Sequence, residues 1–245
     1  MEQKLMKTLI FFCCLVAALE GRGGEYCQEM PFGTDSIPGQ RNYTVRPIDA
    51  RSFIFPGALI GTGALLTFTK SDFDSLVQEE IQEALPGFHT GVDNILMLAP
   101  TVAVFGLNAA GVKGKHSILR ATEYYIVALL ISVGTSEIMK EVIHVQRPDG
   151  SNDQSFPSGH TINAFMGAEF LHQEYGHRSG WYTAAGYTAA TATGFLRMAN
   201  NRHWLGDVIA GAGIGILSTR FSYWLVPRLN KAIHKESHPA PVLKF

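Results

Sequence analysis

Three short blocks in the second half of the chain contain residue types that bind and cleave a phosphate ester. The first block holds Lys140 and Arg147, which are seven residues apart and are followed by Pro148. Seven residues are nearly two helical turns, so a helix that continues to Arg147 places both cations on one face. Pro148 favours a helix end there. Such a pair can bind one anion, although a solvated charged helix end would show the same two residues.

The second block, PSGHT, runs from Pro157 to Thr161 and precedes a segment of helical composition. Proline suits the first turn of a helix. The N–H groups of Ser158, Gly159 and His160 would have no acceptor within the helix, so they can face an anion. The His160 side chain could also donate a proton to a departing oxygen. An ordinary helix cap is the alternative interpretation.

The third block contains Arg197, His203 and Asp207. In a helical turn, a spacing of four residues lets the Asp207 carboxylate hold one imidazole nitrogen of His203 and leaves the other as a nucleophile or base. Arg197 adds a third cation, while Arg202 is interpreted as a surface charge. A local hydrogen bond without a catalytic role is the alternative.

Taken in order, K-x6-R-P, P-S-G-H and R-x5-H-x3-D resemble the phosphate-pocket signature of the type 2 phosphatidic acid phosphatase and vanadium haloperoxidase superfamily. The resemblance covers roughly residues 121–226. It departs from the family pattern at Leu196, where serine or glycine usually precedes the arginine. The resemblance implies that the phosphate is held by three cations and by the start of the second block: Lys140, Arg147, Arg197, Ser158 and Gly159.

The resemblance also implies three catalytic roles. His203 attacks phosphorus to give a phosphohistidine, Asp207 orients His203, and His160 protonates the leaving alkoxide and then activates water. Three fixed cations would stabilise the transition state without a metal. We therefore expect no cofactor and no metal site.

The elements that must position these blocks are apolar. The 245 residues are 46% hydrophobic and 17% charged with a net charge of -1, which argues against a nucleic-acid-binding protein. Three cysteines cannot build a disulfide framework or a thiolate metal site. Six apolar or small-residue-rich segments predict an all-α, multi-pass membrane bundle of about six helices with the phosphate pocket at one helix-end face: 52–69, 94–112, 121–139, 161–174, 181–196 and 207–226.

Small residues favour close helix packing in this bundle. They recur between residues 184 and 194, and Gly211 and Gly215 form a G-x-x-x-G pattern. A soluble all-α enzyme is the alternative, because mean hydropathy is only +0.08 and only some segments reach the roughly 18 charge-free residues of a membrane span.

The chain divides into four parts. Residues 1–19 form a signal-like apolar segment, residues 20–51 a polar arm, residues 52–226 the helical phosphatase domain with its motif core at 121–226, and residues 227–245 a basic tail.

Loop charges predict the topology of the bundle. The basic connector 112–121 and the basic tail indicate the cytoplasmic side, and the acidic loop 70–93 indicates the outer side, together with the three blocks. Six spans would leave residues 20–51 in the cytoplasm, in conflict with an export signal at 1–19. Either 52–69 is a bent or re-entrant element and does not span, or all six segments span and the first segment is not cleaved and is not translocated or is peripheral. We favour the six spans. Apolar residues of the acidic loop predict an amphipathic helix that lies on the membrane or packs on the protein: Phe73, Leu76, Val77, Ile81 and Leu85.

The function expected from these observations is that of a metal-independent lipid phosphate phosphatase in a bacterial inner membrane, with its active site facing the periplasm. Its partners would be the bilayer and a lipid phosphate, and no nucleic acid; the candidate substrates are lipid A, phosphatidylglycerol phosphate, phosphatidate and undecaprenyl diphosphate. A soluble periplasmic class A-type acid phosphatase of the same superfamily is the first alternative. A non-catalytic membrane scaffold or a transporter is the second, and it would be expected to lack one of His160, His203 and Asp207.

Overall fold

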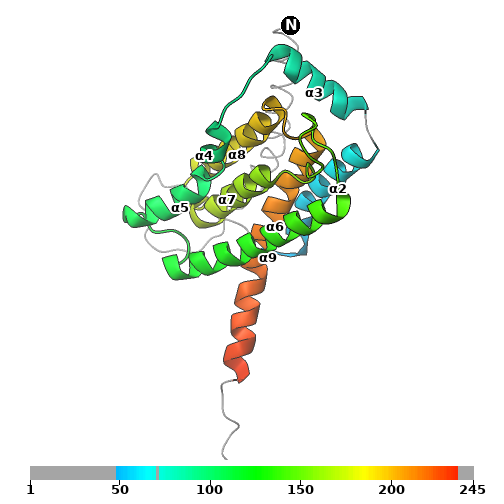
Figure 1. Ribbon diagram of the computed structural model, residues 1–245. Coiled ribbons are helices and arrows are strands. Elements are labelled where there is room, and N and C mark those ends of the chain that lie inside the picture. Colours follow the sequence, from blue (N-terminus) through cyan, green and yellow to red (C-terminus); the bar gives the residue numbers. More distant parts are fainter. Residues whose placement is uncertain (1–47, 70–71, 237–245) are drawn as a thin grey trace, which may run out of the picture.

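The structure is a computed structural model, and it describes residues 48–69 and 72–236 (Figure 1). These residues form helices and connecting loops without a β-strand, which confirms the all-α prediction. The elements are a 3-10 helix, η1 (Ala50–Phe53), and eight α-helices: α2 (Ile54–Phe68), α3 (Asp72–Ala84), α4 (Val92–Leu96), α5 (Ala99–Ala109), α6 (Ile118–Ile143), α7 (Gly159–Tyr175), α8 (Gly180–Ala199) and α9 (Leu205–Glu236).

Two of the predicted segments differ from the helices that form. Segment 94–112 contains most of the short helix α4 and all of α5, which starts anew with Pro100 in its first turn, a position where proline is tolerated. Helix α9 continues through Pro227 to Glu236, so the first part of the predicted tail is helical. The signal-like segment and most of the polar arm lie outside the described residues.

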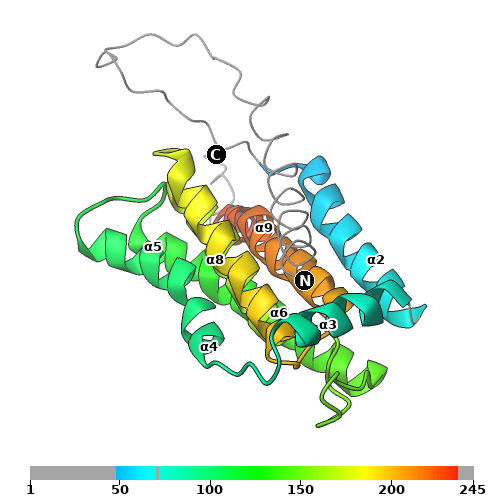
Figure 2. The same cartoon turned by 90° about the horizontal axis from the view of Figure 1, so that it is seen from above.

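Helix α9 is the central element, and α2, α6 and α7 pack along it (Figures 1 and 2). Glycines on α9 allow the close approach. A Cβ atom at Gly215 would lie 2.4 Å from the carbonyl oxygen of Ile162 on α7, and one at Gly213 would lie 2.6 Å from that of Pro56 on α2. A Cβ at Gly211 would lie 2.9 Å from the carbonyl oxygen of Ser158. The prediction that the G-x-x-x-G pattern permits close helix packing is confirmed.

Helix α3 lies across one end of the bundle, while the C-terminal part of α9 projects from the other (Figure 1). Ile81 of α3 is 2% exposed and packs in a cluster with Met198 and Leu205, near the turn between α8 and α9. Phe73 and Leu76 are 51% and 56% exposed. The predicted amphipathic helix therefore packs on the protein, as one of the two alternatives had it, and it also presents apolar side chains outward.

Among the described residues, one helical stretch, Ala50–Phe68, is long and apolar enough to cross a membrane by length and composition. The six-span topology stays a prediction.

Candidate active site

The three blocks meet at the end of the bundle that α3 covers. Helix α6 ends at Ile143, because the next residue, His144, adopts a left-handed conformation with φ 52° and does not continue the helix. Val145 then forms a bridge with Gln154. Arg147 therefore lies in a loop, where its N–H donates to the carbonyl of Asn152 at 2.9 Å. The prediction of a helix that continues to Arg147 is wrong, since the turn at His144 ends it four residues earlier.

Lys140 and Arg147 nevertheless both lie at this end of the bundle. The Lys140 ammonium is 3.3 Å from Glu137 and only 3.6 Å from the position that a Cβ at Gly159 would occupy, so the first block meets the second. Burial, followed by the nearby cations Arg197 and Arg202, lowers the pKa of Arg147. The buried Nε of Arg147 has no hydrogen-bond partner among the described residues. A buried, unsatisfied donor of this kind is suited to binding an anion.

Ser158 caps the start of α7 and is completely buried. Its backbone N–H donates to the Asp207 carbonyl at 3.2 Å, and this hydrogen bond joins the second block to the third. The prediction that the Ser158 N–H faces an anion is therefore wrong. The Ser158 hydroxyl accepts a hydrogen bond from Thr161 at 2.9 Å. Gly159 and His160 occupy the first helical positions, whose N–H groups have no acceptor within the helix.

His203 lies in the loop before α9 and is 2% exposed. Its Nδ1 donates to the carbonyl of Ser155 at 2.8 Å, and the nearer oxygen of Asp207 is 3.5 Å away. That Asp207 oxygen also accepts from the Ser155 hydroxyl at 2.5 Å and from the N–H of Trp204 at 2.9 Å. Because these contacts engage Nδ1, Nε2 is the nitrogen left for chemistry.

Burial lowers the pKa of His203 below its ordinary value, so the imidazole is neutral near pH 7. A neutral ring with its hydrogen on Nδ1 has a lone pair on Nε2, as a nucleophile requires. Ser155, which the sequence analysis did not single out, is therefore the main partner of this histidine, ahead of Asp207.

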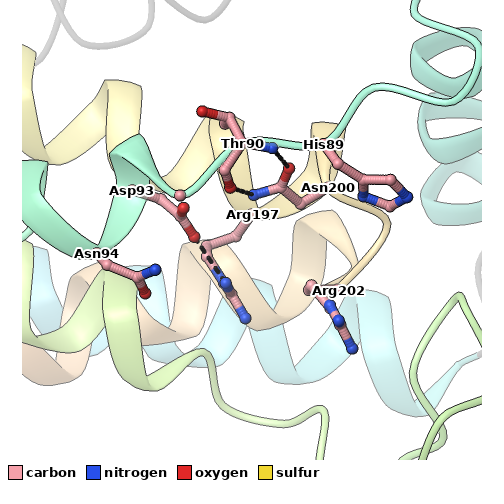
Figure 3. A pocket seen from close by; sticks show the side chains of 8 residues that line it. His89, Thr90, Asp93, Asn94, Arg197, Asn200 and Arg202 are labelled. Carbon is pink, nitrogen blue, oxygen red and sulfur yellow. Dashed lines mark hydrogen bonds and ion pairs between the residues drawn. The ribbon is translucent and has the colours of Figure 1, made fainter.

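Two further residues that the sequence analysis did not assign to the site come from the start of α4. Asp93 is 1% exposed and accepts a hydrogen bond from Arg197 at 2.6 Å (Figure 3). Asn94 Oδ1 lies 2.7 Å from His160 Nε2. The sequence offered only an acidic loop residue and an amide at these positions, with no motif around them. The contacts span about 100 and 66 positions along the chain, so no local pattern could predict them.

Burial, and after it the cation Arg197, lowers the pKa of His160 to about 4. His203 and Arg147 act in the same direction, and Asp93 opposes them. Arg147 of the first block and Arg197 and His203 of the third thus act on the charge of His160 in the second.

A cavity of about 440 Å³ opens beside Arg197 (Figure 3). Arg202, at the edge of the cavity, forms an ion pair with Asp149 at 3.0 Å. Its side chain is 43% exposed, which agrees with the interpretation of Arg202 as a surface charge. Of the three blocks, only the third contributes directly to the lining of the cavity, and Asn94 in the lining contacts His160 of the second block. The lining residues are polar, charged or glycine: His89, Thr90, Gly91, Asp93, Asn94, Arg197, Asn200 and Arg202.

Comparison with known proteins finds a matching family and two relatives. The model of the PAP2 superfamily matches residues 122–231. A lipid A 1-phosphatase from Porphyromonas gingivalis is 39% identical over 163 residues, 66% of this chain and 36% of that protein. The bacitracin transport permease protein BcrC from Bacillus licheniformis is 38% identical over 78 residues, 32% of this chain and 36% of that protein. The chain thus spans about a third of the length of each relative.

Two solved structures are also similar. Aquifex aeolicus LpxE has 20% identity and a TM-score of 0.45, over 59% of this chain and 92% of that one. A transmembrane PAP2 type phosphatidylglycerolphosphate phosphatase from Bacillus subtilis has 18% identity and a TM-score of 0.45, over 73% of this chain and 96% of that one. The superfamily model matches the region that contains all three blocks, so residues 122–231 form a PAP2 superfamily domain.

Proposed function

We propose that the protein is a membrane-bound lipid phosphate phosphatase that works through a phosphohistidine. The observation that carries the proposal is the buried, neutral His203, whose Nδ1 is engaged by Ser155 and Asp207 beside a group of cations. The PAP2 superfamily domain supports the same chemistry. Lipid A is the first substrate to test, because the relative from Porphyromonas gingivalis is named for action on it.

In the first step, Nε2 of His203 attacks phosphorus in line with the leaving oxygen. An N–P bond forms, the P–O bond breaks, and the electron pair leaves on the alkoxide, which takes a proton from His160. A water molecule then gives its proton back to His160 and attacks phosphorus, releasing phosphate and restoring His203. The negative charge of the transition state is stabilised by three cations: Lys140, Arg147 and Arg197.

His160 must be protonated for the first step, yet its pKa of about 4 makes it neutral near pH 7. Nearby cations contribute to that low value, and a bound phosphate carries negative charge that offsets them. Binding of the phosphate would therefore raise the pKa of His160 and favour the protonated ring that the first step requires.

The outer surface supports a lipid substrate. Apolar side chains on α6 are strongly exposed, including Leu130 at 68% and Ile138 at 66%. An exposed apolar face of this kind is typical of contact with a membrane. An active site at the end of such a bundle would let a phosphate head group reach the cations while the acyl chains stay in the bilayer. We place the protein in a bacterial inner membrane with this end toward the periplasm.

The full chain, purified in detergent, tests the proposal through phosphate release. The substrate panel is lipid A, phosphatidylglycerol phosphate, phosphatidate, undecaprenyl diphosphate and the soluble ester p-nitrophenyl phosphate. We expect activity on at least one lipid, persistence in EDTA and inhibition by vanadate, which mimics the pentacoordinate phosphorus. Loss of activity in EDTA with recovery in magnesium would contradict the mechanism. Activity on the soluble ester alone, with extraction free of detergent, would support the soluble acid phosphatase instead.

A further inference from the structure

We infer that Asp93 and Asn94 are positioning residues of the proposed phosphatase, which act through Arg197 and His160 respectively. The inference rests on the proposed function. Two consecutive residues at the start of α4 each contact a different predicted site residue, Arg197 at 2.6 Å and His160 at 2.7 Å. Neither Asp93 nor Asn94 belongs to the three blocks, and both lie outside residues 122–231.

Asp93 fixes the orientation of the Arg197 guanidinium. Nη1 of Arg197 donates to one carboxylate oxygen, and the side chains of Arg197 and Asp93 are only 11% and 1% exposed. The ion pair is monodentate, since the other Asp93 oxygen and the Arg197 Nε are buried without a partner among the described residues. A buried carboxylate also offsets part of the repulsion that Arg197 and Arg147 exert on each other before a phosphate is bound.

Asn94 fixes the orientation of the His160 ring. An amide oxygen only accepts hydrogen bonds, so Nε2 of His160 carries a hydrogen and Nδ1 is the nitrogen that exchanges a proton with substrate. A neutral amide orients the ring without the strong stabilisation of its charged form that a carboxylate would give. Four charged or titratable groups from different parts of the chain act on His160: Asp93, Arg147, Arg197 and His203. Lys140 of α6 lies beside Gly159, the residue next to His160.

The segment that contains Asp93 and Asn94 is hydrogen-bonded to Asn200, the residue directly after α8. The side chain of Asn200 accepts from the N–H of Thr90 at 2.9 Å and donates to the Thr90 carbonyl at 2.9 Å (Figure 3). Helix α4 has only five residues, too few to hold a position by its own hydrogen bonds. The double contact with Asn200 therefore places Asp93 and Asn94 against the site.

Two substitutions of the exposed Asn94 test the inference, and each has a different expected result. Asn94→Asp puts a carboxylate against His160 and should raise its pKa, so the alkaline limb of the kcat profile, which reports loss of the His160 proton in the substrate complex, should move up by about 1–2 pH units. Asn94→Leu removes the acceptor and should lower kcat by about tenfold or more without that upward shift. Wild-type kcat profiles in both variants would overturn the inference for Asn94.

Asp93→Asn keeps the size and an acceptor oxygen but removes the charge. We expect a raised KM for the lipid phosphate, because Arg197 is less firmly oriented, and an alkaline limb shifted to lower pH, opposite to Asn94→Asp. Glu83→Gln on the exposed side of α3 makes the same chemical change away from the site and should match wild type. If Asp93→Asn matches Glu83→Gln in both KM and pH profile, the inference for Asp93 fails.

The wild-type assay separates the two proposals. Absence of phosphate release by the wild-type protein means that the proposed function fails. An active wild type with unchanged Asp93 and Asn94 variants means that only this inference fails. Should Asp93→Asn not fold, the two Asn94 variants still decide whether the start of α4 orients the site.

Discussion

At the level of single residues, the two histidines are both neutral but are engaged by different partners. Nδ1 of His203 contacts a backbone carbonyl and a carboxylate, whereas Nε2 of His160 contacts an amide. In the proposed mechanism, the carboxylate near His203 would stabilise the positive charge that develops as the ring becomes a phosphohistidine. The amide beside His160 carries no charge that would raise the low pKa of that ring. This difference supports the proposed roles of His203 as the nucleophile and His160 as the proton donor.

His203→Ala should lower kcat by at least about 10⁴-fold and leave no acid-labile phosphoprotein, because it removes the proposed nucleophile. The measurement is phosphate release together with acid-quenched trapping of labelled phosphate on the protein. His144→Asn is the matched control, since His144 is more than half exposed and asparagine tolerates its left-handed conformation. Wild-type turnover in His203→Ala would rule out the mechanism.

Asp207→Asn should keep the fold and reduce kcat by about 10²–10⁴-fold. The amide can still accept from the N–H of Trp204, but it no longer stabilises the charge that develops on His203. Steady-state kinetics and a thermal melt of the same preparation check both parts of the prediction. If the drop in kcat is fully accounted for by a loss of folded protein, Asp207 has a structural role and not a catalytic one.

At the level of elements, the site depends on how closely α7 approaches α9 and on how α3 holds the α8–α9 turn. Gln78 and Gln82 of α3 donate to carbonyls at the end of α8, at distances from 3.1 to 3.3 Å. Asp74 of α3 accepts from the N–H of Gly206 at 3.0 Å and so caps the start of α9. One amphipathic helix thus satisfies the ends of two helices next to Arg197 and His203.

Gly215→Ala should destabilise the protein by about 1–3 kcal/mol, because the added methyl meets the Ile162 carbonyl at 2.4 Å and α7 must move. A thermal melt in detergent should show a fall of several degrees, accompanied by lower activity, since α7 begins with Gly159 and His160. Gly134→Ala on α6 is the matched control: its Cβ meets nothing within 4 Å. That control should melt at the wild-type temperature or slightly higher.

Asp74→Asn should flatten the dependence of stability on pH between about 4 and 6. Burial raises the pKa of Asp74 from 3.8 to about 6, so the folded state binds this proton more tightly than the unfolded state. The contribution of Asp74 to the free energy of unfolding of the wild type therefore decreases as the pH rises through that window. An asparagine does not titrate, so this decrease is absent from Asp74→Asn. Melting temperatures of both proteins across pH 4–8 give the comparison, with Glu83→Gln as the exposed control; parallel curves for all three would contradict the assignment.

At the level of the whole molecule, α3, which covers the end with the candidate active site, and the C-terminal part of α9 lie at opposite ends of the bundle (Figure 1). If the bundle spans the membrane, these two ends face different compartments. Loop charge predicts that the acidic end beside α3 lies on the outer side and the basic end in the cytoplasm.

Single cysteines test this orientation in a background that lacks Cys13, Cys14 and Cys27. We expect an impermeant thiol reagent to label Ser75→Cys in intact cells, and to leave Lys231→Cys and Gln40→Cys unlabelled until the cells are opened. Labelling at residues 40 and 75 would instead indicate that the first segment is an export signal. Labelling at 231 but not at 75 would reverse the proposed orientation of the active site.

The sequence by itself determined the all-α fold class, the approximate positions of most helices and the residue types of the site. Apolar periodicity and small-residue spacing are local properties, so they indicated the helices and the glycine contacts of α9. The motif spacing likewise selected residues that fold to one end of the bundle, including His160, His203 and Asp207.

Only the tertiary structure decided how these residues are held. The turn at His144 places Arg147 in a loop, Ser155 rather than Asp207 is the closest partner of His203, and Asp93 and Asn94 reach Arg197 and His160 from a distant segment. The contacts of Asp93 and Asn94 depend on the packing of α4 against α8 and α7. Contacts between residues far apart in the chain leave no period or spacing in the sequence, and for that reason only the packed bundle shows them.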